Sequence, residues 1–293
     1  MRQFAQAAAT ATLALLATLA PANDPNADAD GDWIRIRKTD DGKPAALQTS
    51  VGSYQGRTEA GEPLVVDLVG AVHVGDRRYY RELNARFRDY DVVLYELVAP
   101  EGTRVARGQR VGNDSPLGAM QNGMKSMLGL EHQLEWVDYT PRNFVHADMS
   151  AEQLFASMGD RGEGFMEMYF RLMGQSIAEQ TKQTAAGESP EFDLIMALFS
   201  GDRERQLRIA MAKQMASLEG VLSDFGGPRG STIIHERNAI ALRVLANEID
   251  RGQRRIAVFY GAGHLEDMDE RLRQDFGMRQ TGKEWIDAWR LDR

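Results

Sequence analysis

The chain has 293 residues, 43% of them hydrophobic, and a formal net charge of −8. This length and apolar content support one large core, or a core with an inserted subdomain. An acidic chain is a poor candidate for binding nucleic acid or an anionic membrane, and the absence of cysteine excludes disulfides, thiol nucleophiles and cysteine-ligated metal sites.

The first 22 residues are typical of a cleavable secretory signal peptide. One charge, Arg2, precedes an Ala/Leu/Thr-rich run that ends in Ala20-Pro-Ala22. Cleavage after this sequence removes Arg2 and no acidic residue, so the net charge of −8 becomes −9. Residues 23–32 are acidic and contain proline and small residues, as a flexible leader does. We therefore predict a periplasmic or secreted protein with no stable membrane insertion after cleavage.

Short apolar runs with the character of β-strands lie towards both ends of the remaining chain. They occupy residues 33–37, 46–54, 64–69, 91–96, 256–260 and 285–291. A helix predicted from Asp76 to about residue 88 joins two of these runs into a βαβ unit, whose strands we expect to be parallel and adjacent. The predicted fold is α/β, a mixed central sheet with flanking helices, formed by residues 33–98 and 231–293.

Residues 99–230 are predicted to form a helical insert, or lid, between the two parts of the core. Helices are expected at about 116–134, 161–182, 191–200 and 202–219, and one more begins at Ser150, with Gln153 at the capping-box position. Eleven of the fourteen methionines fall in this insert. Methionine at helical spacing usually belongs to a core, but its flexible side chain also suits a surface that accepts peptides, and both interpretations stay open.

Two Gly-x-x-His motifs follow predicted strands, Gly70-Ala-Val-His73 and Gly261-Ala-Gly-His264. Glycine permits a sharp turn, so each histidine should lie at the carboxyl edge of the sheet, where α/β proteins bind ligands. Glu96 closes another apolar strand and needs a partner to offset its desolvation. Two histidines and one carboxylate can hold a catalytic metal. We predict that His73, Glu96 and His264 meet in one cleft as ligands of a divalent ion (Mn, Co or Zn), with Glu96 also a catalytic candidate.

The sequence His235-Glu-Arg-Asn238 lies at the predicted start of a helix. Glu236 suits the positive end of the helix dipole, and Arg237 could clamp a carboxylate or an oxyanion. Both are catalytic candidates beside Glu96. A second tier of candidate ligands comprises His146, Asp148, His235 and Asn238. Because the sequence lacks G-x-S-x-G, Walker A and a complete G-x-G-x-x-G after a strand, serine hydrolases and nucleotide-binding enzymes lose support.

At these residues the chain resembles the TraB/PrgY/GumN family, which is related to the Tiki proteases. The pattern comprises Gly70-Ala-Val-His-Val-Gly-Asp76, Tyr80, Tyr95-Glu96, Asp138-Tyr139, Asn143-Phe-Val-His-Ala-Asp-Met149, Glu236-Arg-Asn238 and Tyr260-Gly-Ala-Gly-His-Leu-Glu-Asp-Met268. The similarity runs from about residue 64 to 276 and implies an α/β fold like that of erythromycin-esterase and ChaN relatives. Resemblance to the Tiki branch implies metal-dependent peptide hydrolysis with manganese or cobalt. The pheromone-shutdown role of bacterial members is compatible with peptide binding without cleavage. The stretch 33–55 lies outside the pattern.

Three hypotheses follow. In the first, the chain is an exported metal-dependent hydrolase, a peptidase, in which His73 and His264 bind the metal and Glu96 is a ligand or general base. In the second, it sequesters a peptide or small molecule in the methionine-rich insert without catalysis. In the third, it is an esterase-like hydrolase in which histidine and glutamate activate water without a metal.

Overall fold

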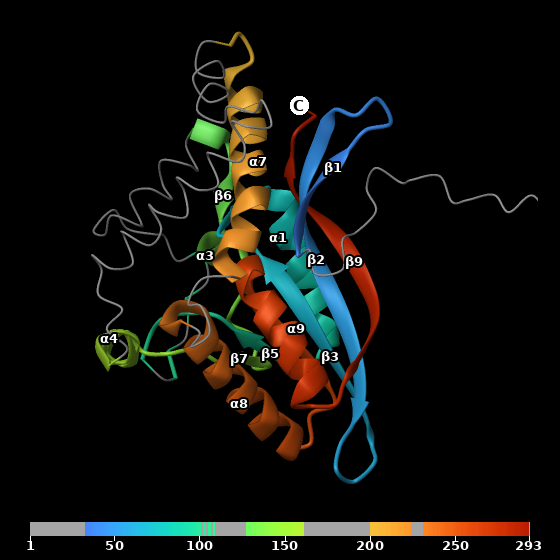
Figure 1. Ribbon diagram of the computed structural model, residues 1–293, viewed down its shortest axis with the longest axis vertical. Coiled ribbons are helices and arrows are strands. Elements are labelled where there is room, and N and C mark those ends of the chain that lie inside the picture. Colours follow the sequence, from blue (N-terminus) through green and yellow to red (C-terminus); the bar gives the residue numbers. More distant parts are fainter. Residues whose placement is uncertain are drawn as a thin grey trace, which may run out of the picture.

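The computed structural model in Figure 1 describes residues 33–100, 102, 103, 105, 106, 108, 127–160, 200–223 and 231–292. The predicted signal peptide (1–22), the leader (23–32) and the helix predicted at 161–182 lie outside the described residues. So do all but the last residue of the helix predicted at 191–200 and most of the helix predicted at 116–134. Among the helices that are described, none is both long enough and apolar enough to cross a membrane.

A mixed seven-stranded sheet with flanking helices forms the core, which confirms the predicted α/β class. Its strands, in spatial order, are β1 (Ile34–Lys38), β2 (Pro44–Arg57), β3 (Pro63–Ala71), β8 (Arg255–Gly261), β5 (Val92–Tyr95) and β7 (Phe144–His146), and β9 (Arg279–Arg290) also pairs with β2. The pairings of β2 with β1, β3 and β9 are antiparallel, whereas β3, β8, β5 and β7 run parallel. The strands that carry the motifs therefore belong to the parallel half.

The expected adjacency of β3 and β5 is wrong, because β8 lies between them and runs parallel to both. The crossover from β3 to β5, through α1 (Arg77–Arg86) and the 3-10 turn η1 (Phe87–Asp89), skips one strand position. Strand β8 fills this position because residues 256–260 are apolar throughout and fully buried, as a central parallel strand requires. The two Gly-x-x-His strands and the Glu96 strand are thus consecutive neighbours.

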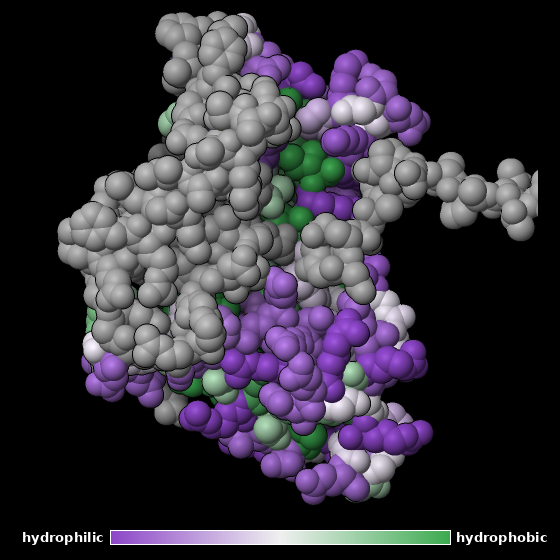
Figure 2. Space-filling view, viewed as in Figure 1, coloured by the Kyte–Doolittle hydropathy of each residue, from purple (hydrophilic) through white to green (hydrophobic). Residues whose placement is uncertain are grey.

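Helices cover the parallel half of the sheet on both faces. In Figure 1, α8 (Arg237–Asp250) and α9 (Leu265–Gln274) lie in front of it and α1 lies behind it. Each helix buries apolar residues at helical spacing, for example Leu265, Met268 and Leu272 of α9. Their outward surface is largely hydrophilic, as Figure 2 shows over α8 and α9.

The described part of the predicted insert contains both helices and strands. The helix predicted to begin at Ser150 is α4 (Ala151–Asp160), and its capping box is present, since the Gln153 N–H donates to Ser150 Oγ at 3.2 Å and the Ser150 N–H to Gln153 Oε1 at 2.8 Å. Further helices are α3 (Gln133–Trp136) and α7 (Arg203–Ser223). Strand β7 joins the central sheet, and β6 (Glu131–His132) pairs with β4 (Val74–Gly75). The core sheet therefore takes one strand from within residues 99–230.

Candidate functional site

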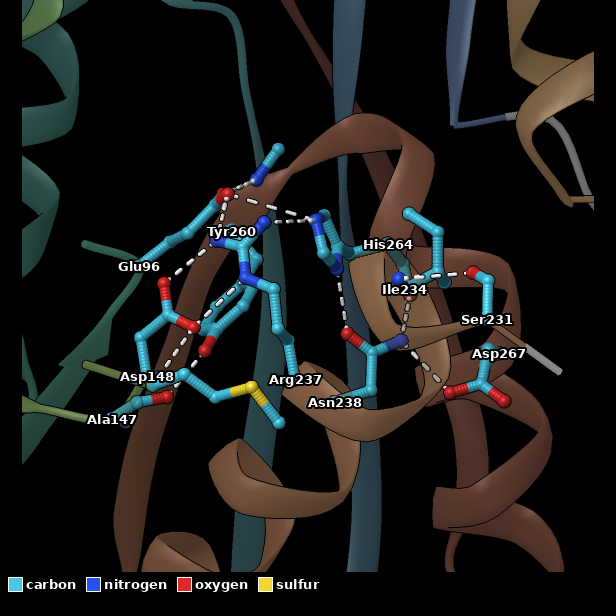
Figure 3. Close-up of polar contacts among 12 residues, drawn as sticks. Glu96, Ala147, Asp148, Ser231, Ile234, Arg237, Asn238, Tyr260, His264 and Asp267 are labelled. Atoms are coloured by element: carbon cyan, nitrogen blue, oxygen red, sulfur yellow. Dashed lines mark hydrogen bonds and ion pairs between the residues drawn. The ribbon is translucent and has the colours of Figure 1, made fainter. Parts of the chain in front are cut away.

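The candidate site lies at the carboxyl ends of the four parallel strands. Glu96 directly follows β5, His73 and Asp148 come two residues after β3 and β7, and His264 comes three residues after β8. Parallel strands end at a common edge, so this topology gathers side chains that are far apart in the sequence. Figure 3 shows how Glu96, Asp148 and His264 lie around Arg237, which comes from the first turn of α8.

Arg237 is the centre of the polar contacts. Its Nη2 donates to Glu96 Oε1 at 2.6 Å, and its Nε and Nη2 donate to the two oxygens of Asp148 at 2.9 and 2.7 Å. His264 Nε2 lies 3.6 Å from Glu96 Oε1 and 3.5 Å from Arg237 Nη1. The Asp148 side chain is 0% exposed, and those of Glu96, Arg237 and His264 are 7–12% exposed. Two buried carboxylates thus share a single guanidinium, which leaves the group with excess negative charge.

The hydrogen bonds of Asn238 fix the tautomer of His264. Asn238 Nδ2 donates to the His264 carbonyl at 2.9 Å and to Asp267 Oδ2 at 2.8 Å, so both amide hydrogens are used. Asn238 Oδ1 must then accept from His264 Nδ1, at 2.7 Å. In the neutral ring the lone pair is therefore on Nε2, which faces Glu96. A lone pair opposite a carboxylate oxygen favours a cation or a hydrogen-bond donor between them.

The surroundings shift the pKa values of this group strongly. Burial lowers the pKa of His264 from 6.5 to about 4, against the opposing charge of Glu96. Burial alone would raise the pKa of the Glu96 carboxyl, but His264, Arg237, His73 and the Gly261 N–H outweigh it and hold this pKa well below its usual value. Around neutral pH the site therefore contains an ionised Glu96 and a neutral His264, the protonation states required of two metal ligands.

The depressed pKa of His264 should make stability depend on pH. The unfolded chain takes up a proton near pH 6.5, whereas the folded imidazole takes it up only near pH 4. Stability is therefore complete above pH 6.5 and falls as the pH drops to 4, by about 3 kcal/mol. Urea unfolding at several pH values measures this loss. In His264→Gln the free energy of unfolding should no longer fall between pH 6.5 and 4.5. Above pH 7 the curves of the variant and the wild type against pH should stay parallel. An unchanged slope would contradict the buried neutral imidazole.

A π-helical turn, η3 (Thr232–Glu236), precedes α8 and sets the positions of Arg237 and Asn238. Ser231 caps it, because its Oγ accepts from the Ile234 N–H at 3.3 Å and its carbonyl accepts from the His235 and Glu236 N–H groups. Two consecutive residues of one helix then hold three partners, since Arg237 holds Glu96 and Asp148 while Asn238 holds His264. Such turns are frequent at functional sites.

The other two predicted residues of this segment, His235 and Glu236, end the turn η3 directly before α8. His235 Nδ1 accepts from the Ser231 N–H at 2.9 Å, and its Nε2 lies 3.8 Å from Asp267, the partner of Asn238. His235 thus belongs to an outer layer that orients His264 through Asp267. Glu236 is at the N-cap of α8, where its side chain makes no capping hydrogen bond.

The histidines at the two flanks of the site differ in their surroundings. His146 Nε2 contacts the Leu97 carbonyl at 2.6 Å, which fixes the chain just after Glu96. His73 is exposed, and in its protonated form it would lower the pKa values of both Glu96 and His264. Its carbonyl accepts from the Gln133 N–H at 2.9 Å. His73 therefore lies at the same edge of the sheet as Glu96 and His264, because β3 and β5 both flank β8.

The two motif glycines are required for different reasons. A Cβ at position 70 would lie 3.0 Å from the Ser50 carbonyl oxygen of β2, so this glycine permits the close approach of two strands. A Cβ at position 261 would lie 3.3 Å from Glu96 Oε2, which accepts a hydrogen bond from the Gly261 N–H at 2.7 Å. The second glycine therefore lets the Glu96 carboxylate approach and bind the backbone N–H. The Gly-x-x-His spacing alone does not reveal this role.

Two supporting residues were not predicted as site residues. Asp267 lies one helical turn beyond His264 and links Asn238 to Arg271, whose Nε contacts it at 2.8 Å. The Tyr260 hydroxyl donates to the Ala147 carbonyl, which fixes the chain next to Asp148. Both belong to motif segments, but only their contacts reveal these positioning roles.

Comparison of the chain with protein-family models, with curated proteins and with solved structures gave no match. The resemblance to the TraB/PrgY/GumN family therefore stays a prediction from the motifs.

Proposed function

We propose that the chain is an exported metal-dependent hydrolase, a peptidase, whose His73, Glu96 and His264 hold a divalent cation that carries the attacking water. One observation carries the proposal. The Nε2 lone pair of His264 faces the ionised Glu96 carboxylate at 3.6 Å, in a buried group with excess negative charge. A divalent cation would compensate that charge, and neutral imidazole and carboxylate are among its preferred donors.

The donor atoms fit such an ion in kind and, for two of them, in spacing. Two donors on one small cation with bonds of 2.0–2.2 Å lie about 3.4 Å apart in tetrahedral geometry, close to the 3.6 Å between His264 Nε2 and Glu96 Oε1. Within the described ranges no three His, Asp or Glu side chains already surround a common point. The third proposed donor is His73, which is exposed and follows β3, the strand next to β8.

Each residue of the site has a distinct role in this proposal. A bound ion would polarise a substrate carbonyl and lower the pKa of its water. Glu96 would serve as a ligand of that ion or as the base for its water, because its carboxyl is held ionised. Asp148 immobilises the guanidinium of Arg237 through two hydrogen bonds. Arg237 Nη1 contacts only His264 Nε2 among the described residues, at 3.5 Å, so it retains a hydrogen for the developing oxyanion.

A second candidate is the metal-independent hydrolase, and the position of Arg237 favours it. This guanidinium already places a cation against both carboxylates. Glu96 and His264 would then activate water directly. The peptide-sequestering alternative depends on the methionine-rich insert, about half of which lies outside the described residues.

Metal content and peptide cleavage test the proposal. Protein purified without added metal should contain a stoichiometric divalent ion, lose cleavage to a chelator and regain it with manganese, cobalt or zinc. His73→Ala should lose both metal and cleavage, and the assignment fails if this variant binds metal and cleaves like the wild type. Cleavage that resists the chelator would support the metal-independent hydrolase. Peptide binding without cleavage that survives both the chelator and His264→Ala would support the binding protein.

A further inference from the structure

A cavity of about 570 Å³ lies outside the candidate hydrolytic site, where α1, α7, β6 and the end of β9 meet. In Figure 1, α1, α7 and β6 come together in the same part of the molecule, away from α8. Five arginines and three acidic residues line the cavity, so its wall carries a net positive charge. Its volume is in the range of cavities that bind small molecules.

The acidic residues of the wall are already paired. Arg77 Nη2 contacts Glu131 at 2.6 Å. Arg208, whose side chain is 6% exposed, contacts Asp76 at 3.4 Å and Glu204 at 3.1 Å. These contacts occupy all three carboxylates that line the cavity. The guanidinium of Arg208 also donates to backbone carbonyls of residues 128 and 129, so it is a rigid part of the wall.

Arg290 contacts Asp292 at 3.1 Å, so within the described part of the chain Arg78 and Arg81 are the lining arginines that remain without an acidic partner. Both are exposed, and they lie three residues apart on α1, so they share one face of the helix. Neither has an acidic partner among residues 33–100, 127–160, 200–223 and 231–292, not even Glu82, which lines an adjoining cavity of about 230 Å³. Two guanidiniums that have no acidic partner among the described residues share one wall with a rigidly held arginine, and together they form a receptor for negative charge.

The position of these arginines is unfavourable for the helix itself. The first turn of α1 has two arginines and no acidic residue, although the N-terminal end of a helix dipole repels cations. Asp76 at the N-cap makes no capping hydrogen bond with its side chain, because its oxygens accept from Arg208 and from the Arg290 N–H. A residue choice that opposes local stability is expected where it serves a function.

We propose that this cavity binds a small polyanion with two neighbouring phosphate or carboxylate groups, held by the guanidiniums of Arg78 and Arg81. The β4–β6 ladder connects the cavity to the hydrolytic site, because Asp76 and Glu131 line the cavity while the Gln133 N–H donates to the His73 carbonyl. Along extended backbone, Asp76 lies about 10 Å from His73. The binding site is therefore separate from the Glu96–His264 pair and does not depend on the proposed hydrolysis.

Calorimetric titration of the full chain with pyrophosphate and with citrate tests this proposal at low ionic strength. The wild type should bind one of them saturably at one site, and Arg78→Gln/Arg81→Gln should weaken binding at least about tenfold. The control Arg88→Gln/Arg243→Gln removes the same charge from two exposed arginines outside the cavity and should bind like the wild type.

Tighter binding of pyrophosphate identifies a phosphate ligand, and tighter binding of citrate identifies a polycarboxylate. Glu96→Gln should bind like the wild type, which separates this site from the proposed hydrolytic one. The proposal is overturned if the wild type shows no saturable binding of either probe at millimolar concentration. It is also overturned if the control loses as much affinity as the cavity variant while both unfold like the wild type, since the effect is then one of net charge.

Discussion

Replacing Arg237 with methionine should lower the free energy of unfolding by about 3–5 kcal/mol at pH 7. Methionine keeps the length and apolar stem of the side chain, but it leaves the carboxylates of Asp148 and Glu96 without their guanidinium. The Asp148 side chain is 0% exposed and that of Glu96 is 12% exposed, so water cannot replace the lost hydrogen bonds. Urea unfolding followed by circular dichroism measures the change.

Neutralising the two carboxylates that Arg237→Met leaves unpaired provides the control. Adding Asp148→Asn and Glu96→Gln to Arg237→Met should restore part of the lost stability, because neutral amides cost less to bury than unpaired carboxylates. Arg237→Lys should stay clearly below the wild type, since an ammonium cannot make the two parallel hydrogen bonds to Asp148. A loss under about 1 kcal/mol for Arg237→Met, the range of exposed ion pairs, would show that this group is not buried.

Glu96→Gln should reduce hydrolytic turnover by about 10²–10⁴-fold. The amide has nearly the shape of the carboxylate but carries no charge, so it neither accepts the proton of an attacking water nor binds a cation comparably. It also places an amide donor towards Arg237 or the Gly261 N–H, the two groups that now donate to the carboxylate. Steady-state kinetics should show the loss in kcat rather than in KM.

A second buried glutamate offers a matched control. Glu248 belongs to α8, is 3% exposed and pairs with Arg251. It lies eleven residues after Arg237 in the same helix, which corresponds to about 16 Å of helix length. Glu248→Gln removes a buried charge of the same kind and should leave turnover unchanged. Retention of more than a tenth of the activity by Glu96→Gln, or an equal loss in both variants, would contradict the role of Glu96.

Local patterns indicated six of the seven strands of the central sheet, the starts of α1, α4 and α7, and the chemistry-bearing residues, but they missed β7 within the predicted helical insert. Apolar β-branched runs closed by glycine indicated β3 and β8, and the Ser150–Gln153 pair indicated the start of α4. Alternation indicated the outer strands β1 and β9. These features depend on neighbours within a few residues, which the sequence contains directly. The choice of Glu96, His264 and Arg237 as candidates also came from such patterns.

Tertiary structure alone decided how these residues meet. No local signal indicates that β8 lies between β3 and β5, because strand order depends on which crossover packs best over the whole sheet. The contacts of the site join residues 26–165 positions apart. Arg237 binds both Glu96 and Asp148, Asn238 fixes the tautomer of His264, and the Gly261 N–H donates to Glu96. Contacts at such separations are set by packing and by the burial of charge, which only the complete fold establishes.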